Sequence, residues 1–487
     1  MWCSVSLLIA LSSQVLAIWP APQSFTSGSS VLWIAPSVHV TYNGASVRPS
    51  SFSYDFYSGT EEVLGVQLQK SYAASNGDSF SSQAIVDGAV SRALQTLFTQ
   101  NIVPWKLVAR NKLIEFEPAA NSQKTYITSL AITQSGADNS TTFKPLSGQV
   151  DESYSLIVGT DGIANITAVS STGVLHALQT FIQLFYQHST GAGMYTNLAP
   201  ISITDAPKFA HRGLNLDVSR NWYPVTDILR TIDALSWNKF NILHIHMTDS
   251  QSWPMDIPAL PLLSQKGAYQ TGLSYKPSDI QLIQTYAIQR GINVIIEFDM
   301  PGHTTAIGLA YPDLIAAFDA KPWDTYCAEP PCGTLQLNNP DVYTFLEKLF
   351  SDVLPRVQKY TAYFHTGGDE VNMQAYTLDP TVKSNDSHII GGHIQKLVDR
   401  NHAQIRAAGL APVVWEEMLL NWNLTLGDDV VVQSWLSDDS VAAIVKQGHK
   451  ALAGNYNFWV SKTNPKLDSE ANKTSVSRLR KRRVARL

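Results

Sequence analysis

Short apolar runs alternate with helical patterns from residue 210 to residue 453, and this alternation restricts the fold more than any other feature of the sequence. The apolar runs predict seven strands, at residues 210–218, 240–247, 293–298, 360–365, 412–415, 430–434 and 449–453. Apolar residues at helical spacing predict helices between them, at residues 225–237, 278–290, 341–360, 388–408 and 438–448. Strands that alternate with helices form a parallel sheet. The pattern therefore predicts an α/β fold, a (β/α)8 TIM barrel with about seven strands present, and a doubly wound sheet is the alternative.

The residues before the barrel pattern predict a separate domain. At 487 residues the chain is long enough for two domains. Residues 18–201 mix strand-like and helical segments, which predicts a small α+β domain with a structural role. Its strand-like runs are at residues 31–34, 113–116 and 154–158, and its helical patterns at residues 82–101 and 173–187. A hinge-like segment at residues 203–207 leads into the barrel domain, expected over residues 207–459.

The start of the chain and its composition favour an exported globular protein. Residues 1–17 contain an apolar run and end in small residues, which is typical of a signal peptide. Apolar residues make up 44% and charged residues 15%, no later run is long enough to span a membrane, and a net charge of −5 gives no reason to expect a nucleic-acid partner. We expect a secreted protein, or a vacuolar or lysosomal one. Five N-glycosylation sequons fit that route, at Asn139, Asn165, Asn385, Asn423 and Asn472.

Two cysteines remain after the predicted signal peptide, Cys327 and Cys332, and four residues separate them. In an oxidising compartment we expect them to form a disulfide that closes a small loop. Zinc binding is the alternative, but no second Cys or His pair stands at a matching spacing.

One hexamer carries the clearest sign of chemistry, His365-Thr366-Gly367-Gly368-Asp369-Glu370. It follows a predicted buried strand, and its two glycines allow a sharp turn. Adjacent carboxylates repel, so one of them should have a raised pKa and keep its proton near neutral pH, which is what a general acid needs. A glycine-rich turn with solvated acids is the alternative.

Polar or aromatic residues follow nearly every predicted strand of the barrel. They are Asp217 and Arg220, then His244, His246 and Asp249, then Glu297, Asp299 and His303, then Asp369 and Glu370, then Trp415, Glu416 and Glu417, and finally Trp435. Active sites of TIM barrels lie at the carboxyl ends of the strands. The sequence therefore predicts one catalytic site at that end.

Metal-assisted hydrolysis is one chemistry open to this set. His244 and His246 face the same way on a strand, and Asp249, Asp299 and His303 add oxygen and nitrogen ligands. That scheme leaves Arg212, Trp415 and Trp435 without a task. Both histidines of the pair are equally explained as hydrogen-bonded core residues.

Glycoside hydrolysis is the other chemistry. It needs one carboxylic acid that protonates the leaving oxygen and a second group that supports the anomeric carbon. Asp369 and Glu370 are sequence neighbours, so their side chains should diverge and not flank a single bond. In substrate-assisted hydrolysis the 2-acetamido group of the sugar is itself the nucleophile. The protein then supplies an acid, a carboxylate for the acetamido N–H and an apolar box, and Glu370, Asp369 and the pair Trp415 and Trp435 fit these needs.

Taken together, the motifs resemble those of the family 20 glycoside hydrolases, the β-N-acetylhexosaminidases. The resemblance rests on His211-Arg212-Gly213, Asp217-x-Ser219-Arg220, His244-x-His246-x-x-Asp249, Glu297-Phe298-Asp299-x-Pro301-Gly302-His303, Gly367-Gly368-Asp369-Glu370, Val414-Trp415-Glu416-Glu417 and Gln433-x-Trp435. These motifs follow the family's order and spacing from about residue 18 to residue 459. The loop between the two cysteines is similar to that of secreted fungal members.

The resemblance implies a zincin-like, hexosaminidase-type α+β domain before the barrel, and a retaining, exo-acting hydrolase. Its substrates would be chitooligosaccharides or glycans capped by β-linked N-acetylglucosamine or N-acetylgalactosamine, cleaved through an oxazolinium intermediate without a cofactor or metal. By motif, Glu370 would be the acid/base and Asp369 would orient the acetamido group. The other implied contacts are Arg212 to sugar hydroxyls, Trp415 and Trp435 as walls of the acetamido pocket, and Asp249, Asp299 and His303 as supports of the acids. The residues expected to be structural are His211, Glu297, Glu416 and Glu417.

The last residues depart from the family pattern, which continues with a Tyr-x-Asp segment and an eighth strand. Residues 460–487 hold nine Lys/Arg against two Asp/Glu, and Val460-Ser461 is how an intron start would be translated. We expect a translated intron or a truncated catalytic domain, and a chain that is poorly folded or weakly active because an opened barrel exposes sheet edges. A non-catalytic sugar-binding remnant and a metal-dependent hydrolase remain alternatives. The sugar preference and the oligomeric state, for which a homodimer is one option, stay open.

Overall fold

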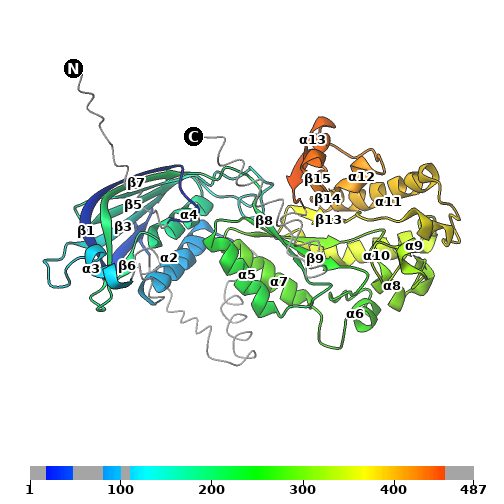
Figure 1. Cartoon of the computed structure of the whole chain (residues 1–487), viewed down its shortest axis with the longest axis horizontal. Coiled ribbons are helices and arrows are strands. Elements are labelled where there is room, and N and C mark those ends of the chain that lie inside the picture. Colours follow the sequence, from blue (N-terminus) through cyan, green and yellow to red (C-terminus); the bar gives the residue numbers. More distant parts are fainter. Residues whose placement is uncertain (1–17, 48–79, 100–109, 456–487) are drawn as a thin grey trace, which may run out of the picture. The chain divides into compact units, whose positions relative to one another are not determined.

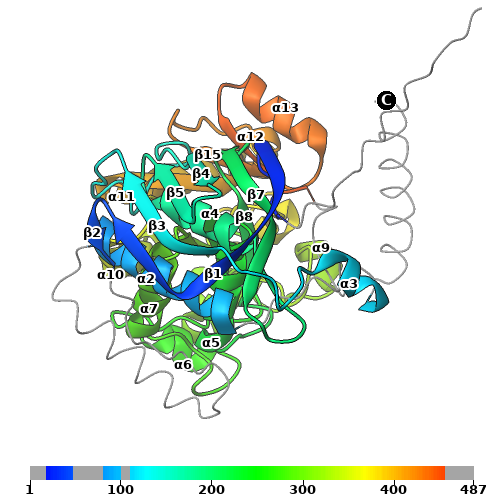
Figure 2. The same cartoon turned by 90° about the vertical axis from the view of Figure 1, so that its left-hand side faces the viewer.

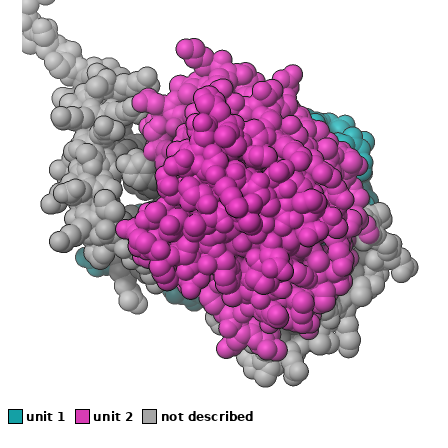
Figure 3. Space-filling model, turned by 90° about the vertical axis from the view of Figure 1, so that its right-hand side faces the viewer, with its two compact units in different colours: residues 1–212, 229–241, 285–293 teal, residues 213–228, 242–284, 294–487 magenta. Residues whose placement is uncertain are grey.

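The computed structural model describes residues 18–47, 80–99 and 110–455. They belong to two compact units, residues 1–212 with 229–241 and 285–293, and residues 213–228 with 242–284 and 294–487 (Figure 3). The predicted signal peptide, the predicted tail and Asn472 lie outside the described residues. In the part that is described, no helix combines the length and the apolar character that crossing a membrane requires.

The first unit is built on a mixed sheet of seven strands in the order β2-β1-β3-β5-β4-β7-β6. The strands are β1 (Ser24–Tyr42), β2 (Ala45–Ser46), β3 (Tyr126–Gln134), β4 (Tyr154–Val158), β5 (Ile163–Ala168), β6 (Tyr186–Gln187) and β7 (Met194–Asp205). The long strand β1 pairs with both β3 and β7 and can be followed beside them in Figure 2. Burial alternates strictly along β5, so one face of the sheet is buried and the other is exposed.

Two helices of this unit pack together, α2 (Ser82–Thr99) and α4 (Ser171–Ile182), and α4 also contacts β4 and β5 (Figure 1). Two sequence predictions are wrong in this unit. Residues 113–116 form the short helix α3 (Leu113–Phe116) and not a strand, because the helical and strand periods cannot be told apart over only four residues. The helix predicted to end at residue 187 ends at Ile182, and β6 follows it.

The second unit is a partial TIM barrel. Its seven strands lie in chain order, β8-β9-β10-β13-β14-β15-β16, with parallel registers between neighbours. They are β8 (Gly213–Asp217), β9 (Ile242–Thr248), β10 (Asn293–Phe298), β13 (Tyr363–His365), β14 (Ala411–Trp415), β15 (Val431–Ser434) and β16 (Lys450–Ala453). A doubly wound sheet reverses its strand order at a switch point, and this order has no reversal, so that alternative is wrong. β8 and β16 form the two edges of the sheet.

Helices connect these strands as predicted, and their ends fall within three residues of the predicted ones. They are α5 (Val225–Trp237), α7 (Pro277–Ile288), α10 (Pro340–Val357), α11 (Ser387–Ala407) and α13 (Asp438–Lys446). The loops at the carboxyl ends carry the shorter helices α6 (Leu262–Gly267), α8 (Thr305–Ala310), α9 (Trp323–Tyr326) and α12 (Glu416–Leu420). Every residue of β9 and β10 is buried, as expected for parallel strands covered on both faces.

Candidate active site

The loop after β13 carries two neighbouring carboxyl groups. Gly367 and Gly368 precede them with φ angles of 69° and 112°. A Cβ atom at Gly367 would collide with Asp299, and one at Gly368 with a side chain of α12. Because glycine alone tolerates both the positive φ and the close approach, the loop lies tightly against the ends of its neighbours. The side chains of Asp369 and Glu370 follow directly and are 19% and 32% exposed.

Glu370 faces a buried histidine that is itself held by a carboxylate. Nδ1 of His303 lies 2.9 Å from Oδ1 of Asp249, and Nε2 lies 3.4 Å from Oε2 of Glu370. Burial by itself lowers the pKa of His303, but Asp249 and the neighbouring aspartates outweigh it and raise the pKa well above its usual value. The arrangement is a chain that runs from the carboxylate of Asp249 through the imidazolium of His303 to the carboxyl group of Glu370.

Asp369 has a different partner. A hydrogen bond joins its carboxyl group to that of Asp299, which also accepts from the backbone N–H of Gly368 at 2.8 Å. Oδ1 of Asp369 and Oδ2 of Asp299 are buried and have no other partner among the described residues. Burial and the charge of Asp369 raise the pKa of Asp299 well above its usual value. Burial also raises the pKa of Asp369, although the charge of His303 and the hydrogen bond with Asp299 oppose that rise. We infer that Asp299 holds the proton of this pair and Asp369 the negative charge.

Beneath the two acids, the buried carboxylate of Glu297 accepts three hydrogen bonds. The donors are Nε2 of His244 at 2.8 Å, Nδ1 of His246 at 2.7 Å and the indole Nε1 of Trp415 at 2.7 Å. Nε2 of His246 is in turn 2.7 Å from Oδ2 of Asp249. A continuous chain of side chains therefore runs from the interior of the sheet to the site.

The same network bears on the metal alternative. His244, His246, Asp249, Asp299 and His303 each belong to a set of three donor residues whose ligand atoms lie within 4.8 Å of one another, but no such set among the described residues holds both His244 and His246. Burial lowers the pKa of His246, but Glu297 and Asp249 outweigh it and raise the pKa well above 6.5. Both nitrogens of a protonated imidazole carry hydrogens, whereas a metal ligand needs a free lone pair. In this structure both nitrogens of His246 are therefore engaged with carboxylates, in an ionic hydrogen-bond network with Glu297 and Asp249.

Arg220 is an arginine whose side chain lies within this cluster. It follows β8 and lies 2.9 Å from Asp217 and 2.9 Å from Asp249, and it also pairs with Glu329. Burial lowers its pKa, but these three carboxylates outweigh burial and keep it charged. Its side chain is 31% exposed, and each of its three guanidinium nitrogens has at least one partner in this cluster.

The structure does not bring Arg212 to this cluster, which corrects the prediction that Arg212 holds the sugar. Arg212 lies one residue before β8, at the amino end of the strand, where its guanidinium pairs with Glu152 at 2.7 Å. Its Nε and Nη1 donate to the backbone carbonyls of Lys239 and Phe209. Applied strictly, the rule that barrel sites lie at carboxyl ends would have selected Arg220.

The two arginines give opposite predictions. For the substrate class that the motif resemblance implies, Arg220→Ala is expected to lower kcat/KM on a chromogenic N-acetylhexosaminide by about 10²-fold, because alanine cannot make the charged hydrogen bonds that a guanidinium can offer to a sugar. Arg212→Ala, the matched control, should leave kcat/KM near that of the wild type and lower the melting temperature, because Glu152 loses its partner. A larger loss of kcat/KM in Arg212→Ala than in Arg220→Ala would contradict this assignment.

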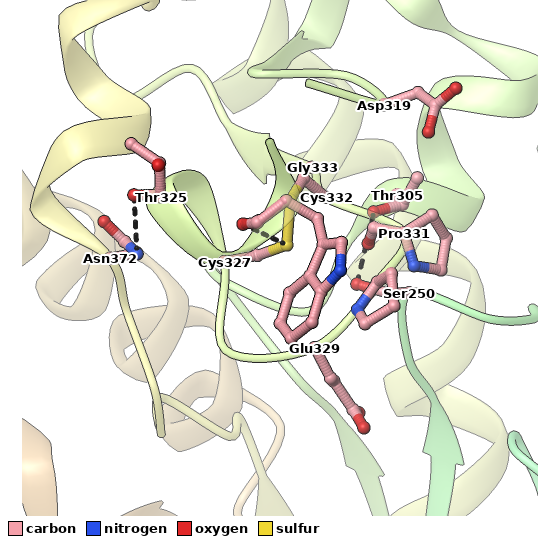
Figure 4. Close-up of a disulfide and its surroundings, with 12 residues drawn as sticks. Ser250, Thr305, Asp319, Thr325, Cys327, Glu329, Pro331, Cys332, Gly333 and Asn372 are labelled. Atoms are coloured by element: carbon pink, nitrogen blue, oxygen red, sulfur yellow. Dashed lines mark hydrogen bonds between the residues drawn. A yellow bond between two sulfur atoms is a disulfide. The ribbon is translucent and has the colours of Figure 1, made fainter. Parts of the chain in front are cut away.

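The predicted disulfide between Cys327 and Cys332 is confirmed (Figure 4), and its loop lines a pocket together with Glu370. The loop is fixed by Thr305, whose hydroxyl donates to the carbonyl of Pro331 at 2.8 Å. Glu329, between the two cysteines, is the partner of Arg220 and was missed by sequence reasoning. A pocket is lined by this loop together with residues of the site: Ser250, Gly302, His303, Tyr326, Glu329 and Glu370.

The two predicted wall residues lie at different depths. Trp415 is 2% exposed, and its ring centroid lies 5.0 Å from that of His365 and 6.1 Å from that of His244. Trp435 is half-buried after β15, and its indole Nε1 donates to Glu417 at 2.9 Å. Contact of either ring with an acetamido group stays a prediction.

Glycosylation also stays a prediction. The sequon residues Asn139, Asn165, Asn385 and Asn423 are all exposed.

Comparison with known proteins gives two family matches that cover most of the chain. Residues 209–482 match the catalytic domain of glycosyl hydrolase family 20, and residues 18–184 match a region described as beta-acetyl hexosaminidase like. A beta-hexosaminidase of the fungus Arthroderma benhamiae is 36% identical over 94% of this chain and 78% of its own length.

More distant relatives are longer than this chain. A chitooligosaccharidolytic beta-N-acetylglucosaminidase of Ostrinia furnacalis is 31% identical over 64% of this chain and 56% of its own length. Among solved structures, a chitobiase of Flavobacterium johnsoniae has a TM-score of 0.65 and 25% identity, covering 91% of this chain and 59% of its own. The chain therefore spans little more than half the length of these two proteins. On the family matches and the fungal relative, this chain belongs to glycosyl hydrolase family 20.

Proposed function

We propose that this chain is an exo-acting β-N-acetylhexosaminidase that works by substrate assistance. The observation that carries the proposal is the division of partners between the two neighbouring acids. Glu370 faces the His303–Asp249 pair, and Asp369 is bonded to Asp299. Two carboxyl groups with separate partners suit two separate tasks on one substrate.

In the first step, Glu370 donates its proton to the glycosidic oxygen while the acetamido carbonyl oxygen attacks the anomeric carbon. The bond from the anomeric carbon to the leaving oxygen breaks, and the electron pair stays on that oxygen. Asp369 accepts the acetamido N–H, orients the nucleophilic oxygen and stabilises the positive charge of the oxazolinium ion. Glu370 then removes a proton from water as the water attacks the anomeric carbon, which regenerates the acetamido group with retention of configuration.

The surrounding residues would bind the terminal sugar. Arg220 offers a fork of donors to its hydroxyl groups, and Trp435 with Trp415 would enclose the acetamido methyl group. The Ostrinia furnacalis relative is named for chitooligosaccharides, so these oligomers are the first substrates to try. Export is part of the proposal, and it is supported by the disulfide and by the signal-like residues 1–17.

The test is release of a chromogenic phenol from an aryl N-acetyl-β-glucosaminide, with the aryl β-glucoside as the control substrate. We expect hydrolysis of the first only, because the second has no acetamido nucleophile. Binding of a thiazoline inhibitor without turnover would instead identify a sugar-binding remnant. Loss of activity with a chelator would favour metal-assisted hydrolysis.

A further inference from the structure

Glu417 on α12 lies beside the catalytic loop, although no step of the proposed reaction uses it. The backbone N–H of Trp415 donates to the carbonyl of Gly367 at 3.1 Å, and Gly368 packs against the side chain of Met418. The start of α12 is thus held against the loop that carries Asp369. Glu417 is 5% exposed, which is unusual for a carboxyl group without a cation beside it.

Glu417 also holds the loop after β15. Its Oε1 accepts from the indole Nε1 of Trp435 at 2.9 Å. The neighbouring Glu416 accepts the backbone N–H groups of Trp435 and Leu436, at 2.9 Å and 2.6 Å. Side chain and backbone of Trp435 are therefore both fixed by α12, and the orientation of the predicted acetamido wall depends on Glu417.

The second oxygen of Glu417 indicates the charge state of the group. Oε2 is buried and has no hydrogen-bond partner within the described part of the chain. Burial raises the pKa of Glu417, and the nearby Asp369 raises it further, to about 8. The titratable groups that act on it are Asp369 after β13 and Glu416 on its own helix, and Trp435 on the remaining side does not titrate. Glu417 is therefore an uncharged carboxylic acid at neutral pH.

We propose that Glu417 is a positioning residue of the reaction, an uncharged acid that fixes the indole of Trp435 and leaves the negative charge of this corner of the site on Asp369. This inference rests on the proposed function, because Trp435 and Asp369 are placed there against the acetamido group. Ionisation of Glu417 would put a second anion beside Asp369 and leave a charged, buried oxygen without a partner. The repulsion between the two anions is then expected to displace Asp369 from its position, and turnover to fall, as the pH rises through about 8.

The test compares Glu417→Gln with Glu417→Ala in pH profiles of kcat and KM from pH 6 to pH 9.5. Glutamine keeps an oxygen for the indole N–H but does not ionise, so the decline of activity near pH 8 is expected to disappear in Glu417→Gln. Alanine removes the acceptor, so KM is expected to be about tenfold higher in Glu417→Ala than in Glu417→Gln. An alkaline decline in Glu417→Gln like that of the wild type, or equal KM values in the two variants, would overturn the proposal.

A second readout does not depend on activity. A buried acid with a raised pKa destabilises the folded state increasingly from pH 4.5, its ordinary pKa, up to about pH 8. The melting temperature of Glu417→Gln is therefore expected to rise relative to that of the wild type between pH 5 and pH 8 and to level off above. If the wild type hydrolyses no aryl N-acetylhexosaminide, the proposed function fails, and this comparison alone decides the charge state. A difference in melting temperature between the two proteins that does not change with pH would overturn the proposal that Glu417 is uncharged at neutral pH.

Discussion

Replacing Glu370 with glutamine is expected to lower kcat for an aryl N-acetyl-β-glucosaminide by about 10³-fold, with little change in KM. An amide cannot donate the proton that the leaving oxygen needs, and general acid catalysis contributes on the order of 10²–10⁴-fold. Binding of the terminal sugar is left to other groups, so KM should stay near the wild-type value. The measurement is steady-state kinetics on the purified variant.

Leaving groups of different acidity make this prediction specific to proton donation. With a dinitrophenyl leaving group, which departs without protonation, the loss in Glu370→Gln should shrink strongly. The matched control is Glu347→Gln, because Glu347 pairs with Arg400 at the surface and its side chain is 53% exposed. Equal losses for acidic and basic leaving groups would mean that Glu370 is not the general acid.

Glu297→Gln is expected to destabilise the second unit by about 3–5 kcal/mol, the usual cost of removing one partner of a buried ionic pair. Glutamine has one oxygen and an NH2 group for the three donors of His244, His246 and Trp415, so a donor must face a donor. The exposed pair of Arg406 and Asp429 is the control, and Asp429→Asn should cost at most about 1 kcal/mol. Urea unfolding of both variants measures the difference.

The pH dependence of this loss has a defined sign. Burial raises the pKa of Glu297, but His246 and the two neighbouring histidines outweigh it, so its stabilisation is complete above pH 4.5 and is lost as the pH falls through its depressed pKa. His246 has a raised pKa, so its stabilisation is complete below pH 6.5 and is lost as the pH rises through that pKa. The stability gap between wild type and Glu297→Gln should be widest between about pH 4.5 and pH 6.5. A gap that does not vary with pH would contradict the ionic assignment.

The barrel could be predicted from the sequence because its signal is repeated. Seven predicted strands have five predicted helices between them, and each strand–helix pair supports the assignment of the next pair. The isolated run at residues 113–116 has no such support, and it proved to be helical. Short apolar runs take their conformation from tertiary contacts, which a single sequence does not reveal.

Within the site, the sequence predicted which residues follow a strand, but it did not predict which side chains contact one another. The two acids could be found because they follow a strand and two glycines. Arg212 and Arg220 both lie in motifs of the resemblance, so the motifs alone could not show which of them belongs to the site. The structure distinguishes them, because Arg212 precedes β8 and Arg220 follows it. Glu329 gave no sequence signal of its own, because it reaches Arg220 from a distant loop. Glu417 lies in a motif after a strand, but its hydrogen bond to Trp435 after the next strand could not be read from the sequence.

The central claim is that the substrate's acetamido oxygen is the nucleophile and that Asp369 and Glu370 only position it and move the proton. The most direct test is kcat/KM for aryl β-glucosaminides in which the N-acetyl group carries none, one, two or three fluorine atoms. Fluorine withdraws electron density from the carbonyl oxygen, so substrate assistance predicts a steep fall of kcat/KM with each fluorine, by about tenfold or more per step. Rates that do not depend on fluorination would contradict substrate assistance and require a nucleophile from the protein or from water.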